Sequence, residues 1–322
     1  MNKSFTFQQE INWYCHPARK AKLLYWQNPK VGCSSIKKSL WKNESGSAPG
    51  NAHIRGQSPF PLMSSENSCE FKDFKLFTYV RNPFSRILSA YLDKIGKGSD
   101  RHIWRPFCQQ FSLPRATTKE QFSFKDFLKK IRSTHPSNLD PHFRPQFNGL
   151  LPHVLSYDFI GFLETKGSIE EFLSSHSVDY VHSAPHSRGS NKKIGDYYSQ
   201  EEVDLVLDIY EKDFDHFGYS TALSDYASPG KLTSLANSGL VHPSQIFEDF
   251  EGFLNRDAIE PHSSSFHKLS SFDSDRRKVE FLKGFIKNCG AINSSVFIKE
   301  AINILNANHE LATMKLLLER VD

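Results

Sequence analysis

Residues 23–40 of the sequence read LLYWQNPKVGCSSIKKSL. The stretch opens with the apolar run Leu23–Trp26, continues through Pro29 and Gly32, and ends with Ile36 and Leu40 four positions apart. An apolar run followed by turn residues and then by helical spacing is typical of a buried strand, a tight loop and a helix. We therefore predict a strand-loop-helix unit, the building block of an α/β domain.

A second junction of the same kind follows. Residues 75–80 are predicted to form a strand that runs directly into Arg81. Asn82 is a good helix cap and Pro83 suits the first helical turn, so we expect a helix that continues to about Ile95.

The segments that follow alternate between patterns typical of strands and patterns typical of helices. We predict helices over 122–131, 168–173 and 201–214 and a strand over 157–163, and we interpret residues 43–70, rich in Ser, Asn, Gly and Pro, as a long surface loop. Strands that alternate with helices favour a parallel sheet. The predicted fold class is α/β, with a P-loop-like open parallel sheet flanked by helices.

The character of the chain changes after Tyr219. Apolar helical patterns near residues 246–254, 279–286, 296–305 and 311–318 are separated by polar spacers. We predict one domain over residues 1–222 and an all-helical C-terminal extension of unknown role over residues 223–322.

Composition excludes several classes of protein. Of the 322 residues 38% are hydrophobic, and no stretch approaches the length of a membrane-spanning helix. A net charge of +4 is too small for a nucleic-acid binder, so any anion site must be local.

The first twenty residues lack the apolar core of a signal peptide, and we expect a cytoplasmic protein. The cysteines are widely spaced without a C-x-x-C pair, which predicts reduced thiols and no metal site: Cys15, Cys33, Cys69, Cys108 and Cys289.

The two junctions contain the groups of an anion site. Gly32 permits close backbone approach, the following helix directs N–H groups at a ligand, and Lys30 adds a charge. At the second junction, Arg81 can clamp a phosphate and Ser89 can donate a hydroxyl. The first loop is not a Walker A loop, because no Gly-Lys-Ser/Thr ends it. For each residue alone, a solvated lysine, an arginine that caps a neighbouring helix and a solvent-facing serine are the alternatives.

Residues 29–35, PKVGCSS, and residues 80–91, VRNPFSRILSAY, resemble the two motifs of carbohydrate sulfotransferases that bind 3′-phosphoadenosine 5′-phosphosulfate (PAPS). The chondroitin and HNK-1 type is most similar, and the heparan and uronyl 2-O type is more distant. The resemblance extends through residues 140–146, 157–165 and 209–219, so that it spans roughly residues 22 to 220.

This resemblance implies a PAPS-dependent carbohydrate O-sulfotransferase that releases 3′-phosphoadenosine 5′-phosphate (PAP). It implies that Lys30 contacts the bridging oxygen of the donor, that the backbone of Gly32 to Ser35 surrounds the 5′-phosphate, and that Arg81 and Ser89 hold the 3′-phosphate. The full set of expected donor-binding residues is Lys30, Val31, Gly32, Cys33, Ser34, Ser35, Arg81, Ser89 and Arg188.

Two residues are candidates for the base that takes the proton of the acceptor hydroxyl. His142 is the first, because an imidazole can act as a base near neutral pH, and in the similar enzymes of the heparan type this role is assigned to a histidine in a similar segment. Glu164 follows a predicted strand, where ligands gather in open α/β sheets. The alternatives are a structural or surface histidine, and a glutamate that pairs with an arginine or caps a helix.

Two other functions are alternatives to sulfuryl transfer. A nucleotide kinase or related phosphotransferase needs a Walker-type lysine, which the sequence lacks, and a catalytically silent nucleotide-binding or glycan-binding module does not need both Lys30 and Arg81. The sequence predicts no nucleic-acid partner, no membrane span and no metal. The acceptor and the oligomeric state are not predicted.

Overall fold

The computed structural model describes residues 12–53, 58–96, 104, 107–108, 113, 122–134, 136, 139–152, 155–183, 193–232 and 242–245. The chain divides into two compact units. The first comprises residues 1–9, 63–72 and 243–322, and the second comprises residues 10–62 and 73–242.

A mixed four-stranded sheet lies at the centre of the second unit. Its strands, hydrogen bonded in this order, are β1 (Cys15–Ala18), β2 (Leu23–Trp26), β3 (Lys75–Val80) and β4 (Phe159–Phe162). Strands β2, β3 and β4 are parallel, whereas β1 pairs antiparallel with β2. The α/β class is confirmed, but the prediction of a purely parallel sheet is wrong at this edge. Only residues 19–22 connect β1 to β2, and a parallel neighbour needs a crossover of a dozen residues or more.

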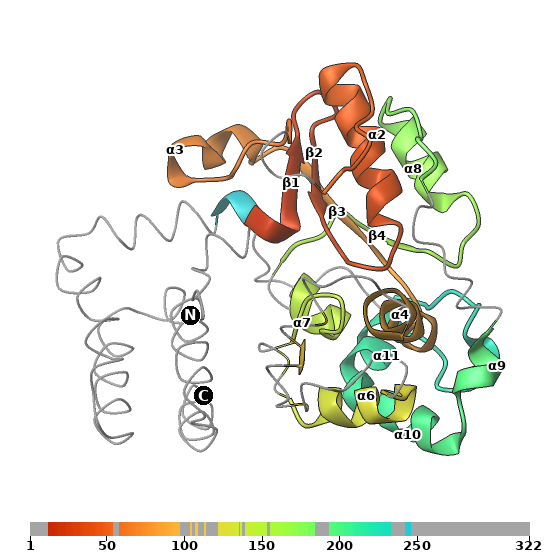
Figure 1. Cartoon of the computed structure of the whole chain (residues 1–322). Helices are drawn as coiled ribbons and strands as arrows, with labels where there is room; N and C mark the ends of the chain where they lie inside the picture. The colour runs from red at the N-terminus through yellow and green to blue at the C-terminus, as the bar shows by residue number, and fades with distance from the viewer. Residues whose placement is uncertain are drawn as a thin grey trace, which may run out of the picture. The chain divides into compact units, whose positions relative to one another are not determined.

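Helices cover both faces of this sheet. Figure 1 shows α2 (Cys33–Ser45) and α8 (Ser168–Ser175) on one side, and α4 (Pro83–Ala90) and α7 (Gln146–Leu150) on the other. Tyr25 and Phe77 of the sheet pack against Ile36 and Leu40 of α2 and against Leu173 of α8 in one buried core. Burial of this apolar surface fixes α2 beside the end of β2.

The helix after β3 begins where it was predicted. The side-chain oxygen of Asn82 accepts a hydrogen bond from the N–H of Phe84 at 3.0 Å, and Pro83 occupies the first turn. The π-helix η3 (Tyr91–Gly96) follows α4 directly, so the described helical structure ends at Gly96, which confirms the predicted end near Ile95. π-Helices are frequent at functional sites.

Further helices among the described residues of this unit are α6 (Phe124–Arg132), α9 (Ile194–Tyr197), α10 (Gln200–Ile209), α11 (Glu211–Phe217) and the 3₁₀-helix η7 (Leu223–Asp225). The prediction of one helix over 201–214 is wrong, because the chain leaves the helical conformation at Tyr210. The buried hydroxyl of Tyr210 donates to the carbonyl of Phe143 at 2.7 Å, and this contact stabilises the break.

The predicted surface loop over residues 43–70 is wrong at both ends. Helix α2 continues to Ser45, and Gly46 ends it in the left-handed conformation, with φ 84°. In the first unit, Ser64 caps the short helix α3 (Ser65–Ser68), which leads into η2 (Cys69–Phe71). An element of four residues is too short to give a periodic signal in the sequence.

Several predictions concern residues outside the described ranges. The helical patterns between residues 246 and 318 are among them, so the C-terminal extension and the boundary near residue 222 stay predictions. Among the described helices, none combines the length and the apolar character needed to cross a bilayer. The cytoplasmic location also stays a prediction.

Candidate active site

The candidate site lies at the edge of the sheet where the three parallel strands end. Strands β2, β3 and β4 end at Trp26, Val80 and Phe162, and the loops that follow contain the predicted site residues. In open α/β sheets, ligands bind outside the carboxyl ends of the strands.

The loop after β2 has an unusual backbone. Lys30 adopts the left-handed conformation at φ 69°, and Gly32 does so at φ 74°. A side chain on Gly32 would be strained, and its Cβ would lie 3.0 Å from Cδ1 of Ile169. A lysine with positive φ is uncommon and costs about 1 kcal/mol or more, which is typical of functional sites.

Gly32 is also the N-cap of α2. Within the described residues, no hydrogen bond is made by the backbone N–H of Cys33 or Ser34, whereas that of Ser35 donates to the carbonyl of Gly32 at 3.0 Å. The start of a 13-residue helix thus directs N–H groups and the positive end of its dipole toward the loop. This arrangement favours an anion.

The side chain of Lys30 points at an acid on η3. Its Nζ lies 3.2 Å from Oδ2 of Asp93, and the two side chains are only 9% and 6% exposed. The same carboxylate oxygen lies 3.4 Å from Nζ of Lys94. Burial lowers the pKa of Lys30 below its ordinary value, while Asp93 acts in the opposite direction.

Arg81, in the turn after β3, connects the two junctions. Its Nε donates to the hydroxyl of Ser85 at 3.0 Å, and its Nη1 donates to the carbonyl of Lys30 at 3.3 Å. Burial lowers the pKa of Arg81 to about 10, so the guanidinium is charged at neutral pH. The two turns are therefore in direct contact.

Ser89 lies one helical turn after Ser85 on α4. It is 7% exposed, and its hydroxyl makes no hydrogen bond to another described residue. A hydroxyl at this position has both its donor and its acceptor capacity available for a ligand.

A buried amide fixes the relative position of both turns. The Oε1 of Gln146 accepts from the side chain of Asn28 at 2.8 Å and from the backbone N–H of Arg81 at 3.0 Å. Its Nε2 donates to the carbonyl of Arg81 at 2.8 Å. Asp213 of α11 in turn accepts from the backbone N–H groups of Gln146 and Phe147 at 2.9 and 2.7 Å. The break of the helix at Tyr210 lies three residues before this aspartate.

A buried guanidinium connects the first loop to the segment that contains His142. Arg86 is 1% exposed, and it donates to the carbonyls of Pro29 at 3.1 Å, Arg144 at 2.9 Å and Pro141 at 3.2 Å. Pro29 and Pro141 immediately precede Lys30 and His142. One side chain therefore holds the backbones of both candidate catalytic residues.

His142 has a carboxylate partner. Its Nδ1 lies 2.7 Å from Oδ1 of Asp140, which also accepts from the backbone N–H of His142 at 2.9 Å. Burial raises the pKa of Asp140, but the contacts with His142 and the charge of Lys94 outweigh it and keep this pKa below its ordinary value. Nε2 of His142 contacts no hydrogen-bonding group among the described residues. A charged Asp140 favours the tautomer with the proton on Nδ1 and a lone pair on Nε2.

Glu164 lies two residues after β4, and both of its oxygens are engaged. Oε1 accepts from the backbone N–H of Asn82 at 2.8 Å, and Oε2 accepts from the hydroxyl of Tyr219 at 3.1 Å. Burial raises the pKa of Glu164 above its ordinary value, and the nearby charge of Arg81 opposes this shift. In this arrangement the carboxylate supports the turn that contains Arg81.

The remaining predicted donor-binding residues differ in their surroundings. Val31 is fully buried in the core, Cys33 is partly buried, and the hydroxyl of Ser35 is engaged with the backbone of residue 183. The hydroxyl of Ser34 lies 3.0 Å from Nε2 of His53, a neighbour that sequence reasoning missed. Arg188 lies outside the described residues.

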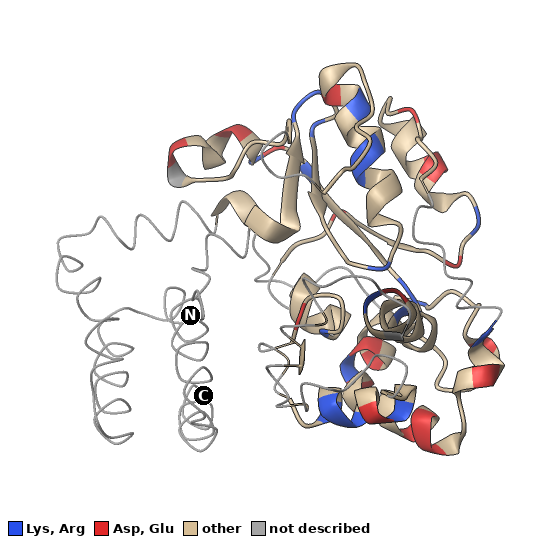
Figure 2. Cartoon of the chain, viewed as in Figure 1, with Lys and Arg blue, Asp and Glu red and all other residues tan. Residues whose placement is uncertain are grey.

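Charges of both signs surround the site. Figure 2 shows basic and acidic positions gathered where the strand ends meet α4. Across the ranges that the structure describes, no group of three or more His, Cys, Asp or Glu side chains has a metal-binding arrangement.

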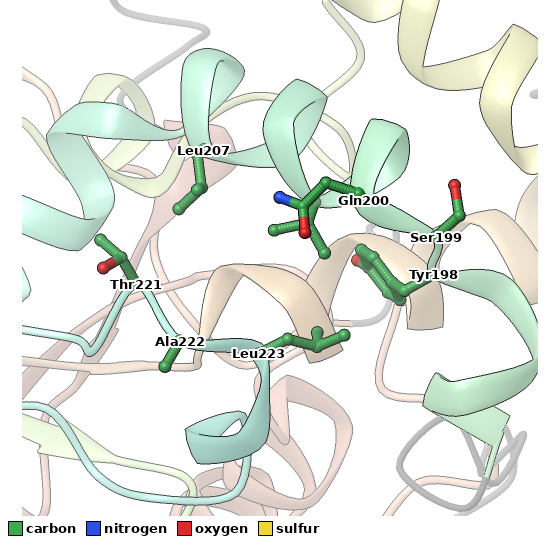
Figure 3. Close-up of a pocket in the computed structure, with 8 residues that line it drawn as sticks. Tyr198, Ser199, Gln200, Leu207, Thr221, Ala222 and Leu223 are labelled. Carbon is green, nitrogen blue, oxygen red and sulfur yellow. The ribbon is translucent and has the colours of Figure 1, made fainter.

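A separate cavity of about 420 Å³ lies at the start of α10 (Figure 3). Residues 198–200, Val203 and Leu207 face residues 221–223 across it. Its lining contains no cationic side chain, and it includes none of the predicted site residues. It therefore has no group to neutralise a phosphate.

Four site residues were not recognised in the sequence: Arg86, Asp93, Gln146 and Asp213. Arg86, Gln146 and Asp213 lie in segments that carry the family resemblance, which is the signal that could have identified them. Arg86 falls in the helix after β3, whose residues are all buried. A buried arginine needs polar partners, which the spacing of apolar residues does not reveal.

Comparisons with known proteins identify the family of the chain. The model of the sulfotransferase family matches residues 16–220. The chain is 26% identical to carbohydrate sulfotransferase 14 of Danio rerio over 62% of its own length and 60% of the relative's. It is 25% identical to carbohydrate sulfotransferase 9 of Homo sapiens, over 63% and 52% respectively, and 26% identical to carbohydrate sulfotransferase 10 of Xenopus laevis, over 62% and 65%. The chain thus spans between 52% and 65% of the length of these relatives. No solved structure matches it.

Proposed function

This chain belongs to the sulfotransferase family, and we propose that it transfers the sulfuryl group of PAPS to a hydroxyl group of a carbohydrate. The hydrogen bond from Arg81 to the carbonyl of Lys30, at 3.3 Å, carries the proposal, because it joins two cationic turns in one site. The names of the three relatives support a carbohydrate acceptor.

The donor carries anions at two ends, and the site offers a cationic group for each. The 5′-phosphosulfate binds at the start of α2, where Lys30 and the N–H groups of Cys33 and Ser34 surround it. The 3′-phosphate binds to Arg81 and to the hydroxyl of Ser89. A site built for a 3′-phosphate discriminates against nucleotides that lack it, because the charge-assisted hydrogen bonds from Arg81 to that phosphate are then not made.

Transfer proceeds in line. The acceptor oxygen forms a bond to sulfur, the bond from sulfur to the bridging oxygen breaks, and the electron pair of that bond stays on the departing phosphate. Lys30 stabilises the charge that develops there, and the base removes the proton of the acceptor hydroxyl. Positioning and electrostatics supply most of the catalysis, as in phosphoryl transfer.

His142 is the base that the contacts favour. Its Nδ1 is held by Asp140 at 2.7 Å, so Nε2 presents a lone pair to the acceptor. Glu164 was the other candidate, but its two oxygens already accept from Asn82 and Tyr219. We assign Glu164 the support of the Arg81 turn.

The His142→Ala variant is expected to lower turnover by about 100-fold or more, which is typical for loss of a general base, with unchanged affinity for PAP. Initial-rate kinetics and a PAP titration measure the two quantities. His176→Ala is the matched control, because His176 is a partly buried histidine that directly follows α8, contacts the carbonyl of Phe172 and has no part in the proposed chemistry. A loss of thermal stability without a loss of turnover would return His142 to a structural role.

A transfer assay tests the function itself. The full chain is incubated with a panel of glycans and with one of two donors, PAPS labelled in its sulfuryl group or ATP labelled in its γ-phosphate. Each glycan is also supplied in a form with all hydroxyls methylated. Label should appear only in glycans with unmodified hydroxyls. Transfer from the γ-phosphate of ATP instead would support the phosphotransferase alternative, and no transfer from either donor would contradict an enzymatic role.

A further inference from the structure

The helical stretch formed by α4 and η3 carries an acid that the transfer reaction does not use directly. Asp93 is 6% exposed, and one of its oxygens contacts the ammonium groups of both Lys30 and Lys94, at 3.2 and 3.4 Å. The lysine side chains are themselves only 9% and 15% exposed. One carboxylate thus stands between two cations that have little access to water.

Removal of this carboxylate would leave two ammonium groups facing each other. Like charges in a poorly solvated place cannot both persist, and the more deeply buried group loses its proton first. Lys30 is the more deeply buried of the two. A neutral Lys30 can no longer stabilise the negative charge on a departing phosphate.

We infer that Asp93 is a positioning residue that keeps the Lys30 ammonium charged and aimed at the site where the donor's bridging oxygen binds. The inference rests on the proposed sulfuryl transfer, and it assigns a role in that reaction to a residue that does not touch the reacting atoms. Because Asp93 pairs with Lys30, it lies on the side of the sulfur from which the phosphate departs. The base must lie on the opposite side of the sulfur, so Asp93 does not compete with His142.

The groups around Lys30 determine in which direction its pKa shifts. Burial lowers the pKa of Lys30, Asp93 raises it, Cys33 of α2 also raises it, and Lys94 lowers it. Because the charged lysine is the active form, activity is lost as pH rises through this pKa. Loss of Asp93 therefore shifts the alkaline limit of activity to lower pH.

The Asp93→Asn variant tests the inference, because it keeps the shape of the side chain and removes the charge. The titration midpoint of Lys30, followed by NMR on the full chain with ¹³C-labelled lysine, should fall by about one pH unit or more. The Lys30 signal is identified by its absence from the Lys30→Ala variant. The alkaline limb of the rate profile should move in parallel. Asp93→Glu should restore both midpoints toward the unmodified values.

Asp179→Asn is the matched control, because Asp179 forms a Lys–Asp pair with Lys42 at 2.9 Å on an exposed surface. This variant should leave the Lys30 midpoint and the rate profile unchanged. A Lys30 midpoint that is the same in Asp93→Asn and in the unmodified chain would overturn the inference, whatever the rate. The titration needs no donor, so absence of PAPS-dependent transfer would count against the proposed function alone. Circular dichroism of Asp93→Asn verifies that the variant is folded.

Discussion

The Lys30→Ala variant should lose sulfuryl transfer by about 100-fold to 1000-fold while the protein stays folded. The lysine supplies the positive charge next to the departing phosphate, and no second cation is proposed to contact the bridging oxygen. Its left-handed backbone, at φ 69°, is held by the hydrogen bond from Arg81 to its carbonyl, and this bond persists when the side chain is shortened. Initial rates with saturating PAPS measure the effect, and thermal unfolding verifies the fold.

Lys42→Ala is the control for this prediction. Lys42 lies on the same helix-forming segment, in α2, but its side chain is 41% exposed and pairs with Asp179 on the surface. Turnover in this variant should equal that of the unmodified chain. A Lys30→Ala variant that keeps full turnover would remove the mechanism proposed for the leaving group.

The second large effect is expected for Arg81→Ala, and it concerns binding. The guanidinium is the cation proposed for the 3′-phosphate, and truncation of one partner of a buried charge pair costs about 2 kcal/mol or more, which is roughly 30-fold in affinity. Affinity for PAP should fall by this factor, and affinity for AMP, which lacks the 3′-phosphate, should change much less. Titration of the variant with both nucleotides measures the difference.

Arg132→Ala is the corresponding control. Arg132 of α6 pairs with Asp208 on the surface and is 60% exposed, so its removal changes the net charge as Arg81→Ala does without touching the site. If Arg81→Ala weakened PAP and AMP equally, the arginine would act on the shared part of the nucleotide. The assignment of the 3′-phosphate to Arg81 would then be wrong.

Local signals in the sequence predicted much of the sheet and its helices. Gly32 and the pair Asn82 and Pro83 have backbone requirements that belong to single residues, so both strand-to-helix junctions were recognised. The antiparallel strand β1 was not predicted, because its four residues are too few to give a periodic signal. The break at Tyr210 was not predicted because it depends on a partner distant in sequence: the hydroxyl of Tyr210 bonds to Phe143, which lies 67 positions earlier.

The candidate site was likewise predicted only in part. Lys30 and Arg81 were assigned to one site because both strand-to-helix junctions resemble donor-binding motifs of one family. The groups that hold them were not, since Gln146 and Arg86 bond to backbone carbonyls and amides that any residue possesses. Asp140 was included in the family resemblance without a role, and its contact with Nδ1 of His142 gives it one.

We propose above all that the two turns at the strand ends bind opposite ends of one nucleotide. Each turn contacts one of the two separate phosphate groups of this nucleotide. A calorimetric titration of the unmodified full chain with PAP, ADP and AMP tests it most directly, because PAP differs from AMP only in its 3′-phosphate. We expect PAP to bind about 100-fold more tightly than AMP or ADP, since a buried guanidinium pairs with the extra group. Equal affinities for PAP and AMP would contradict the claim.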